Sequence, residues 1–390
     1  MSHHFDLLVI GGGVIGLSVA WRAARRGLRT AVVDPAPGSG ASHAAAGMLA
    51  PVSEVTYTEE PLLRLGLASL DRWPAFAAEL GADSGLDLDY RTDGTLDVAF
   101  GADDLAALDE LAAFTEKLGL PAERLTGREC RRLEPMLAPS VRGGLLAGGD
   151  AWVDPRRVTG ALLAALARTG GALVRSRVAG VETTAGTTAG TETAGTGTGT
   201  GTGTVTGVRL ATGEIIGASR VLLAAGAWSG ALEGLPAEAV PPVRPVKGQI
   251  MRLRSPSRIL QRCVRGVVHG SSVYLVPRGD GEVVVGATQE EMGFDTRVTA
   301  GGMWELLRDA RELVPGVTEL ELGDVVAGLR PGTPDNLPLV GPTIVPGLSL
   351  ATGHHRGGVL LAPLTADLCL GDADGELSAS CSPLRFQERR

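Results

Sequence analysis

Two arginines in the last third of the chain have the chemistry to hold a small molecule that carries a carboxylate. Arg330 ends the apolar run Val325–Leu329 before a Pro-Gly turn, and Arg356 lies in the glycine-rich segment Thr352–Gly358. A guanidinium is planar and donates two parallel hydrogen bonds to a carboxylate, which fixes the orientation of the bound group. An arginine at the end of a buried strand can also belong to a structural ion pair, and a loop arginine can simply bind backbone carbonyls. The spacing alone does not decide between these uses.

A glycine-rich turn near the N-terminus offers a second chemistry, the binding of a pyrophosphate. The residues from Gly11 to Gly16 match the pattern GxGxxG. In this pattern Gly11 makes the tight turn, Gly13 lets the backbone approach the pyrophosphate, and Gly16 lets a helix pack on a strand. The helix N-terminus presents unpaired N–H groups to the phosphates. Asp34 follows at a distance that suits a carboxylate accepting both ribose hydroxyls, and a carboxylate there disfavours a 2′-phosphate.

The elements that position this turn form one βαβ unit. The apolar run Phe5–Ile10 predicts a buried parallel strand, the periodicity from Val14 to Arg26 predicts a helix, and Thr30–Val33 predicts a second buried strand. Strand, glycines, helix, strand and acid occur in the order that a dinucleotide site requires. The segment therefore predicts a site for the ADP half of a dinucleotide.

Three further segments of small residues favour FAD over NAD. They are Gly40–Leu49, Ala224–Trp228 and Gly353–Gly358. The residues from Gly38 to Gly47 are expected to form a loop. A flavin stays bound and its flat ring must be surrounded by backbone, which small residues allow to approach closely. Any one of the three could be an ordinary tight turn, whereas the three together indicate FAD.

Length and charge limit the classes of partner. A chain of 390 residues suits two domains, and its net charge of −8 disfavours nucleic acid and anionic membranes. We see no apolar run of about 18 residues and no charged leader followed by an apolar segment. The four cysteines are scattered and indicate neither a disulfide framework nor a zinc site. We therefore expect a cytoplasmic protein with a small-molecule substrate and no bound metal.

The rest of the chain alternates between helical and antiparallel-strand patterns. The expected helices are Pro61–Leu80, Leu105–Leu118, Arg156–Arg168, Met303–Leu313 and Val359–Cys369. The expected strands are Leu86–Phe100 (broken by Asp93-Gly94), Gly171–Val181, Val205–Leu210, Arg220–Gly226, Val246–Leu253, Ser272–Pro277, Glu282–Ala287 and Leu348–Ala351. The stretch Thr183–Gly207 is almost wholly Gly, Thr and Ala, which is typical of a flexible insertion between two strands.

This order predicts an α/β protein in which one domain is inserted into another. A discontinuous Rossmann-like FAD-binding domain would comprise residues 1–85, 150–243 and 325–390. An α+β substrate-binding domain with a mainly antiparallel sheet would comprise residues 86–149 and 244–324.

Seven motifs make the chain similar to the D-amino-acid-oxidase-like flavoproteins. They are GGGVIG followed by VVD in the first βαβ unit, GASHAAAGMLAP at 40–51, VDP at 153–155, AAGAWSG at 224–230, RPVKGQ at 244–249, GLRPGTPD at 328–335 and TGHHRGGVLLAP at 352–363. GASHAAAGMLAP is the most specific of them and GxGxxG the least. Within that family the sequence most resembles the glycine oxidases of thiamine biosynthesis, over nearly the whole chain apart from the Gly/Thr insertion.

The resemblance implies FAD held without a covalent bond. Relatives that attach the flavin use a cysteine just before their TPD-like segment, and this chain has no cysteine from residue 264 to 368. The backbone at Val178 would meet the adenine, and the stretch from His354 to Leu360 would meet the flavin. The implied FAD-binding residues, with those of the glycine-rich turn, are Gly11, Gly13, Val14, Ile15, Gly16, Asp34, Pro35, Ser42, His43, Gly47, Met48, Leu49, Val178, His354, His355, Arg356, Gly357, Gly358, Val359 and Leu360.

The resemblance also assigns the substrate end. Arg330 would anchor the carboxylate of an amino acid, Tyr274 would face the substrate, and Arg356 would lie near both substrate and flavin. The cofactor performs the chemistry, so no side chain is expected to act as acid or base, His354 and His355 included. The α-hydrogen would leave as hydride to the flavin, and the N-terminus of a helix starting near Gly357–Gly358 would stabilise the negative charge that develops on the ring.

The expected reaction yields an imino acid, which water converts to an oxo acid and ammonia, while dioxygen takes the electrons and forms hydrogen peroxide. Glycine, sarcosine and small D-amino acids all carry the same carboxylate, so the choice of substrate stays open. One alternative is a dehydrogenase that passes electrons to a quinone. A second is a dinucleotide-binding protein without redox turnover. The family resemblance further implies a homo-oligomer, commonly a homotetramer.

Overall fold

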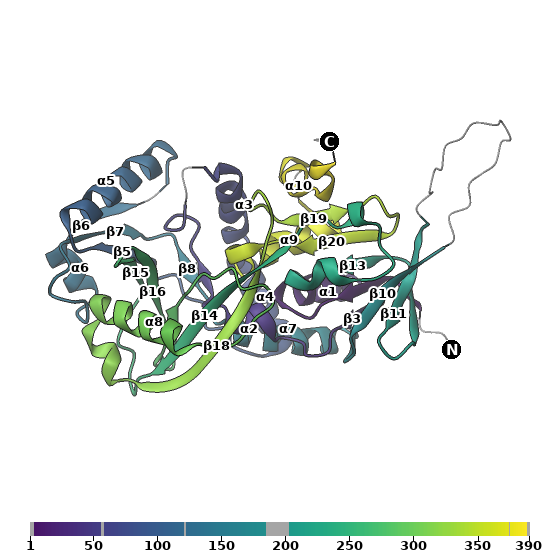
Figure 1. Cartoon of the computed structure of the whole chain (residues 1–390), viewed down its shortest axis with the longest axis horizontal. Coiled ribbons are helices and arrows are strands. Elements are labelled where there is room, and N and C mark those ends of the chain that lie inside the picture. Colours follow the sequence, from purple (N-terminus) through teal and green to yellow (C-terminus); the bar gives the residue numbers. More distant parts are fainter. Residues whose placement is uncertain (1–3, 56–57, 121, 185–202, 374, 388–390) are drawn as a thin grey trace.

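The strands of the chain form four sheets in the computed structural model, which describes residues 4–55, 58–120, 122–184, 203–373 and 375–387 (Figure 1). A six-stranded and a four-stranded sheet occupy one half of the elongated molecule, and an eight-stranded sheet occupies the other. The mixed α/β architecture confirms the predicted fold class: a Rossmann-like part with parallel strands and a second part with a mainly antiparallel sheet.

The six-stranded sheet contains the predicted βαβ unit. In spatial order its strands are β19 (Leu339–Pro342), β20 (Leu348–Thr352), β13 (Val221–Leu223), β2 (Leu7–Ile10), β3 (Thr30–Val33) and β9 (Ala172–Val174). All neighbours pair in parallel except β19 and β20. The helix α1 (Val14–Arg25) joins β2 to β3, so the glycine turn leaves the carboxyl end of a central strand. Ligands of open parallel sheets bind at this edge.

Alternate residues of β2 pack into two different cores. Leu7 and Val9 belong to the core shared with α1, α4 (Trp73–Ser84), α7 (Pro155–Arg168) and α9 (Ala362–Leu370). Leu8 and Ile10 pack instead against the four-stranded sheet. A strand buried on both faces needs the continuous apolar run that the sequence shows. The sheet is therefore the middle layer of three.

The four-stranded sheet covers the far face of the six-stranded one. Its order is β1 (His4–Phe5), β12 (Ile215–Ala218), β11 (Val205–Leu210) and β10 (Val178–Thr183). β10 and β11 pair antiparallel, as expected for the two strands around the Gly/Thr insertion. Of that insertion, residues 185–202 lie outside the described part of the chain.

The eight-stranded sheet builds the other half of the molecule. Its order is β18 (Glu321–Gly332), β14 (Arg244–Arg254), β17 (Glu282–Gly286), β16 (Ser271–Pro277), β15 (Cys263–Val268), β5 (Thr95–Ala99), β7 (Gly143–Ala147) and β6 (Glu123–Thr126). Every pair is antiparallel except β15 with β5. One face packs on α8 (Ala300–Leu313); the helices α5 (Ala102–Lys117) and α6 (Gly127–Leu133) pack near β5, β6 and β7.

The opposite face of this sheet turns toward the first half of the molecule. Ile250, Val276 and Val284 pack there with Ala46 and Trp152. Ala46 precedes β4 (Met48–Leu49), and Trp152 is in β8 (Ala151–Trp152), which pairs with β4. Because side chains alternate along a strand, this face also carries the candidate substrate residues.

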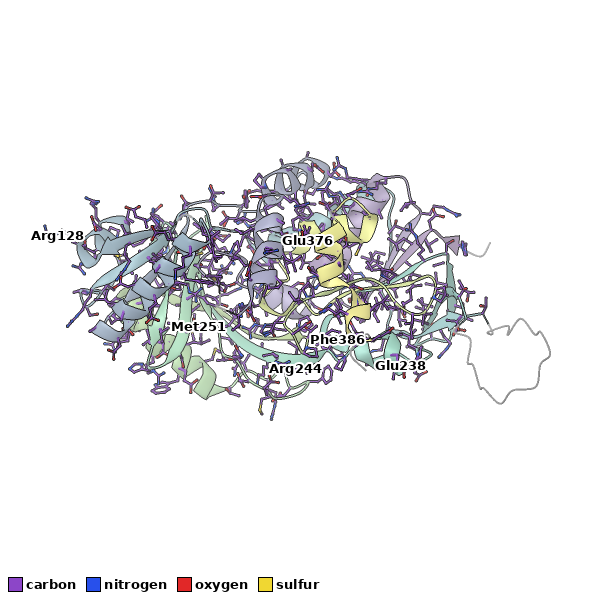
Figure 2. All side chains as sticks on the ribbon, turned by 90° about the horizontal axis from the view of Figure 1, so that it is seen from above. Arg128, Glu238, Arg244, Met251, Glu376 and Phe386 are labelled. Carbon is purple, nitrogen blue, oxygen red and sulfur yellow. The ribbon has the colours of Figure 1, made fainter. Side chains whose placement is uncertain are left out.

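The long strands β14 and β18 run from the large sheet into the centre of the molecule (Figure 1). β18 stays paired with β14 as far as Gly332, so it remains in the large sheet beyond residue 325, where we expected the FAD-binding domain to resume. Figure 2 shows the two halves from above, with Arg128 and Met251 in the half of the large sheet and Glu238 and Glu376 in the other. The division into two domains stays a prediction.

Three expected strands are wrong in extent. The expected strand Phe5–Ile10 is divided, with Phe5 in β1 of the four-stranded sheet and Leu7–Ile10 forming β2 of the six-stranded sheet. Residues 171–181 form two strands, β9 and β10, that belong to different sheets, because each half finds a different partner. In the segment 86–100 only β5 is a strand, and Asp89, with φ +52°, lies outside the extended region. The break expected at Asp93-Gly94 is where β5 begins, but the residues before it do not form a strand. Strand partners come from distant parts of the chain, so the local pattern did not reveal the divisions between sheets.

The helical segments also differ from the prediction. The expected helix 61–80 is two helices, α3 (Glu60–Leu70) and α4, because Pro74 in the first turn of α4 cannot continue a preceding helix. The expected loop 38–47 contains the short helix α2 (Gly40–Ala44), which packs on β18 at Gly328. The last predicted helix begins at Ala362, with Pro363 in its first turn, rather than near residues 357–358.

None of the helices in the described ranges is long and apolar enough to cross a membrane.

Candidate active site

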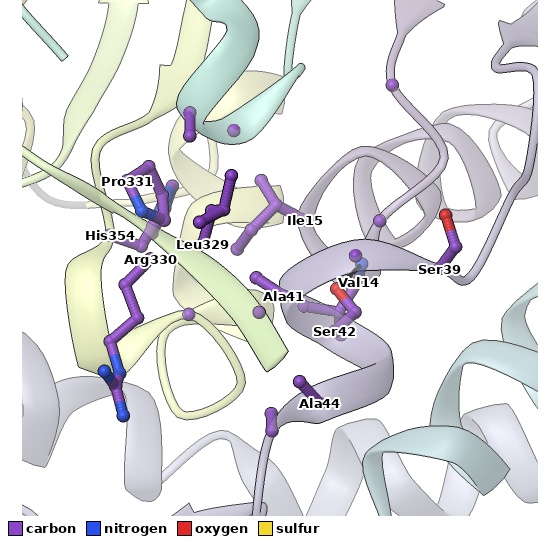
Figure 3. Close-up of a pocket in the computed structure, with 18 of the residues that line it drawn as sticks. Val14, Ile15, Ser39, Ala41, Ser42, Ala44, Leu329, Arg330, Pro331 and His354 are labelled. Atoms are coloured by element: carbon purple, nitrogen blue, oxygen red, sulfur yellow. Dashed lines mark hydrogen bonds between the residues drawn. The ribbon is translucent and has the colours of Figure 1, made fainter. Parts of the chain in front are cut away.

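A large cavity of about 810 Å³ lies where the carboxyl edge of the six-stranded sheet meets the inner face of the large sheet. Its wall includes the glycine turn, α2, the segment Ala224–Trp228, β18 and the segment His354–Val359. The three small-residue segments that suggested FAD therefore line one space, which is near the upper end of the roughly 300–1,000 Å³ typical of ligand pockets. Figure 3 labels residues from three elements that line this space: Val14 and Ile15 of α1, Ala41, Ser42 and Ala44 of α2, and Leu329 and Arg330 of β18.

The glycine turn keeps its backbone exposed to the cavity for steric reasons. Gly11 has φ +109°, and a Cβ there would lie 2.7 Å from the carbonyl carbon of Ala224 and overlap its oxygen. A Cβ on Gly16 would overlap the carbonyl oxygen of Gly11, so Gly16 is needed for packing and does not line the cavity. A Cβ on Gly13 would approach Ser42 Oγ to 3.2 Å. The turn thus offers bare backbone where a pyrophosphate would lie.

Asp34 is positioned by two backbone N–H groups. The N–H of Gly12 donates to one carboxylate oxygen at 2.7 Å, and the N–H of Ala36 donates to the other at 2.7 Å. Both bonds hold the carboxylate at the carboxyl end of β3, on the wall of the cavity. Arg177, Val178 and Glu233 line the cavity as well, so the predicted adenine-binding backbone shares this space with the predicted ribose acceptor.

The structure brings most of the predicted FAD residues together. The predicted residues on the cavity wall are Gly11, Gly13, Val14, Ile15, Asp34, Pro35, Ser42, Gly47, Met48, Val178, His354, His355, Arg356, Gly358 and Val359. Those that do not line it are Gly16, His43, Leu49, Gly357 and Leu360. His43 is exposed on α2, where its backbone carbonyl accepts from Arg156 at 3.1 Å. Ser42 accepts from the N–H of Val14 at 2.9 Å, which joins α2 to the first turn of α1.

Arg330 extends from β18 toward the substrate end of the cavity. Its guanidinium lies over Gly248 of the neighbouring strand and donates to the carbonyl oxygens of Thr288 at 3.2 Å and Lys247 at 3.4 Å. Both hydrogen bonds are donated by Nη1, and they fix the orientation of the planar guanidinium. The fork that a carboxylate requires is therefore held in place by backbone.

Tyr274 lies beside this guanidinium. It is on β16 opposite Gly286 of β17, where any Cβ would overlap its ring. Burial raises the pKa of Tyr274 to about 12, and the Glu54 carboxylate adds to the rise while Arg330 opposes it. The phenol therefore stays protonated at neutral pH and can donate a hydrogen bond. Arg330 and Tyr274 together form the carboxylate-binding arrangement that the sequence suggested, and their roles stay predictions.

The glycine beneath Arg330 gives a first test of this arrangement. In Gly248→Ala the new Cβ would lie 2.5 Å from the Cζ of Arg330 and displace the guanidinium. We expect the KM for a carboxylate-bearing substrate to rise about tenfold or more with FAD still bound, because small displacements of a positioning group are costly. Steady-state kinetics on the purified holoprotein measures this. Gly301→Ala in α8, where a Cβ meets nothing within 4 Å, is the matched control, and equal KM values for the two variants would contradict the assignment.

Arg356 is placed differently from Arg330. Its Nη2 lies 2.8 Å from Glu59 Oε2 and donates to the carbonyl oxygen of Glu54 at 3.3 Å. The residue lines the cavity, as predicted, but its guanidinium is engaged by the segment that precedes α3. In this arrangement Arg356 organises the wall of the cavity near the substrate end.

His354 and His355 are both held neutral. Burial lowers the pKa of His354 to about 3, and its Nε2 is 2.9 Å from Thr365 Oγ1. Burial, with Arg330, Arg356 and Arg244 nearby, lowers the pKa of His355 to about 4. Neither histidine changes protonation near neutral pH.

The low pKa of His354 makes stability depend on pH. In the unfolded chain His354 has a pKa of 6.5 and binds a proton as the pH falls below that value, whereas in the folded protein it stays neutral down to about pH 3. The contribution of His354 to stability is therefore fully present above pH 6.5 and is lost as the pH drops toward 3. The slope from this residue approaches ~1.4 kcal/mol per pH unit. Urea unfolding at pH 5 and pH 7 should show a smaller difference for His354→Gln than for the wild type. His4→Gln, at an exposed site, should keep the wild-type difference; an unchanged difference in His354→Gln would contradict the burial argument.

Several residues that line the cavity were not predicted from the sequence. At the substrate end these are Glu54, Arg265, Ser272 and Thr288. Glu54 follows the motif GASHAAAGMLAP, so an acid next to that motif was an available signal. Arg265 pairs with Tyr274 across β15 and β16, and only the strand register reveals that it shares the face of Tyr274.

The comparisons with known proteins agree with this site. The family model described as FAD dependent oxidoreductase matches residues 6–370. The chain is 34% identical over 381 residues to the glycine oxidase of Geobacillus kaustophilus (strain HTA426), covering 94% of this chain and 92% of that protein. It is 35% identical over 364 residues to the bifunctional protein ThiO/ThiG of Trichormus variabilis (strain ATCC 29413 / PCC 7937), covering 93% of this chain and 52% of the relative.

The fold leads to the same conclusion. The crystal structure of glycine oxidase from Geobacillus kaustophilus matches with a TM-score of 0.86 and 32% identity, over 98% of this chain and 99% of that one. The bare glycine turn, the fixed carboxylate of Asp34 and the cavity of about 810 Å³ fit the cofactor of this family. The chain thus belongs to the family of FAD-dependent oxidoreductases, and its cofactor is FAD.

Proposed function

We propose that the protein is an FAD-dependent amino-acid oxidase that converts glycine to the imino acid, and hence to the oxo acid and ammonia, with hydrogen peroxide formed from dioxygen. Sarcosine and small D-amino acids are further candidate substrates. The likeness to glycine oxidases and to ThiO/ThiG proteins supports this substrate and a place in the formation of the thiamine thiazole.

The observation that carries the proposal is the pair of Arg330 and Tyr274. Both line the cavity that also holds the glycine turn, and Arg330 lies beside the Tyr274 hydroxyl. A fixed guanidinium and a protonated phenol bind a carboxylate in one orientation. An α-amino acid bound in this way has its α-carbon at a set distance from the wall, which is what an oxidation at that carbon requires.

The residues of this chain bind and orient, and FAD, when bound, supplies the hydride acceptor. The cofactor residues that we propose are the predicted ones on the cavity wall, with Gly13, Val14 and Ser42 at the pyrophosphate and Asp34 at the ribose. Gly358 and Val359 also line the cavity just ahead of α9. Their backbone is our candidate for stabilising the charged flavin, in place of a helix starting at Gly357.

Oxygen consumption separates this proposal from a quinone-dependent dehydrogenase. With glycine in air we expect one hydrogen peroxide and one ammonia for each glycine consumed, and no turnover of L-alanine. Sarcosine and D-alanine complete the substrate panel. Reduction of a quinone analogue without hydrogen peroxide would refute the oxidase and favour the dehydrogenase. We also propose a cytoplasmic homo-oligomer, such as a tetramer, which size-exclusion chromatography with light scattering tests.

A further inference from the structure

The amino group of the substrate needs an acceptor that the carboxylate anchor does not supply. Among the described residues on the cavity wall, the acidic ones are Asp34, Glu54 and Glu233. Asp34 is bound to Gly12 and Ala36 at the glycine turn, and Glu233 pairs with Arg209 beside β10. Glu54 is therefore the acidic side chain available at the substrate end.

Glu54 shares that end with the carboxylate anchor. The Glu54 carboxylate and the Arg330 guanidinium both shift the pKa of the Tyr274 phenol, and all three residues line the cavity, so these groups lie close to one another. The backbone carbonyls nearest Arg330, those of Lys247 and Thr288, already accept from its Nη1. A neutral amine bound between these groups would donate a hydrogen bond to Glu54, and the positive charge that forms on its nitrogen during oxidation would lie beside this carboxylate.

Two cavity arginines hold the Ser53–Glu54 segment in place. Arg265 Nη1 donates to the carbonyl oxygen of Ser53 at 2.7 Å, and Arg356 Nη2 donates to that of Glu54 at 3.3 Å. The N–H of Ser53 donates to the buried Asp150 at 3.2 Å, which fixes the same segment from the other side. Arg265 is itself paired with Asp97 at 3.2 Å. These contacts give Arg265 and Arg356 a structural role at the substrate end, because both hold the backbone of the Ser53–Glu54 segment in place.

We propose that Glu54 binds the amino group of the substrate and stabilises the positive charge that develops on its nitrogen during oxidation. The inference rests on the proposed function. The Cα–H bond breaks and its hydrogen leaves with both electrons to FAD, while the nitrogen lone pair forms the C=N bond. The nitrogen of the product is therefore an iminium cation. A carboxylate held beside it favours this charged state over the neutral amine.

The two ends of the substrate allow a test in which ligand affinities move in opposite directions. Acetate carries the carboxylate of glycine without the amine, and it can be titrated into the oxidised holoprotein through the flavin absorbance. The affinity for glycine is the apparent Kd given by the dependence of the flavin reduction rate on glycine concentration after rapid anaerobic mixing. Glu54→Gln keeps the shape and removes the charge. We expect it to weaken glycine about 10- to 100-fold, the loss of a charge-assisted hydrogen bond. Acetate should bind equally well or more tightly, because a nearby negative charge has gone.

Rapid anaerobic mixing with glycine gives the second readout. Saturating glycine should reduce the flavin of Glu54→Gln more slowly than that of the wild type, and Glu54→Asp should recover part of the rate. Glu60→Gln is the matched control, because Glu60 is exposed and pairs with Arg64 on the surface of α3. It should behave as the wild type.

Three outcomes would overturn the proposal. Unchanged glycine affinity and reduction rate in Glu54→Gln would remove Glu54 from the site. An equal loss of glycine and acetate affinity would show structural damage rather than amine recognition. If no amino acid reduces the wild-type flavin, the proposed function fails first and this inference fails with it, so the two failures are distinguishable.

Discussion

Arg330→Ala should leave FAD bound and abolish efficient turnover of the amino acid. The variant keeps the glycine turn, Asp34 and the rest of the cavity, but it loses the planar fork above Gly248. Removing one partner of a buried, hydrogen-bonded charge pair costs about 2–5 kcal/mol, so kcat/KM should fall by about two to three orders of magnitude. Steady-state kinetics and the flavin spectrum of the purified variant measure both parts of the prediction.

Two further variants test whether the loss of activity comes from the bidentate geometry of Arg330. Arg330→Lys keeps a positive charge without the bidentate geometry and should lie between the wild type and Arg330→Ala. Arg297→Ala removes an exposed arginine that pairs with Asp295 away from the cavity, and it should match the wild type. If Arg330→Ala retained the normal KM for glycine, the carboxylate would be bound elsewhere.

Gly11→Ala should give a colourless and less stable protein. The new Cβ would overlap the carbonyl oxygen of Ala224, which directly follows β13, and φ of +109° strains any residue with a side chain. Relief requires the turn to move away from β13, which removes the surface for the pyrophosphate. Overpacking costs about 1–3 kcal/mol, and the backbone strain adds about 1–2 kcal/mol. FAD content by absorbance and Tm by thermal unfolding measure the two effects.

Gly27→Ala is the control that separates the effect of backbone strain at a positive φ from the effect of steric overlap by the new Cβ. Gly27 also has a positive φ, of +80°, but a Cβ there meets nothing within 4 Å. It should lose about 1 kcal/mol of stability from the backbone alone and keep its FAD. If Gly11→Ala bound FAD as tightly as Gly27→Ala, the turn would not be the pyrophosphate site.

The cofactor half of the site could be predicted because its determinants are local. The turn from Gly11 to Gly16, the strands around it and Asp34 all lie within one βαβ unit, where strand and helix periodicity and glycine sterics act over a few residues. The same holds for the antiparallel strands β16 and β17. The anchors Arg330 and Tyr274 came from the family resemblance, because their spacing alone fitted a structural ion pair or a core residue equally well.

The features of the fold that could not be predicted from the sequence depend on contacts between segments that are far apart in the chain. Residues 171–181 divide between two sheets because β9 and β10 find different partners. The helix α2 forms where small residues pack on Gly328, far along the chain. Arg265 was missed for the same reason, since the register of β15 with β16 is what places it beside Tyr274. Glu54 differs, because it closely follows the motif GASHAAAGMLAP and that signal was not used.

Anaerobic titration of the purified holoprotein with glycine tests the central claim most directly. If the cavity is the site of an amino-acid oxidase, the protein is yellow as purified, glycine bleaches its flavin absorbance, and L-alanine does not. Admission of air should then restore the oxidised spectrum. A protein that carries no flavin, or a flavin that stays oxidised with glycine, sarcosine and D-alanine alike, would contradict the account.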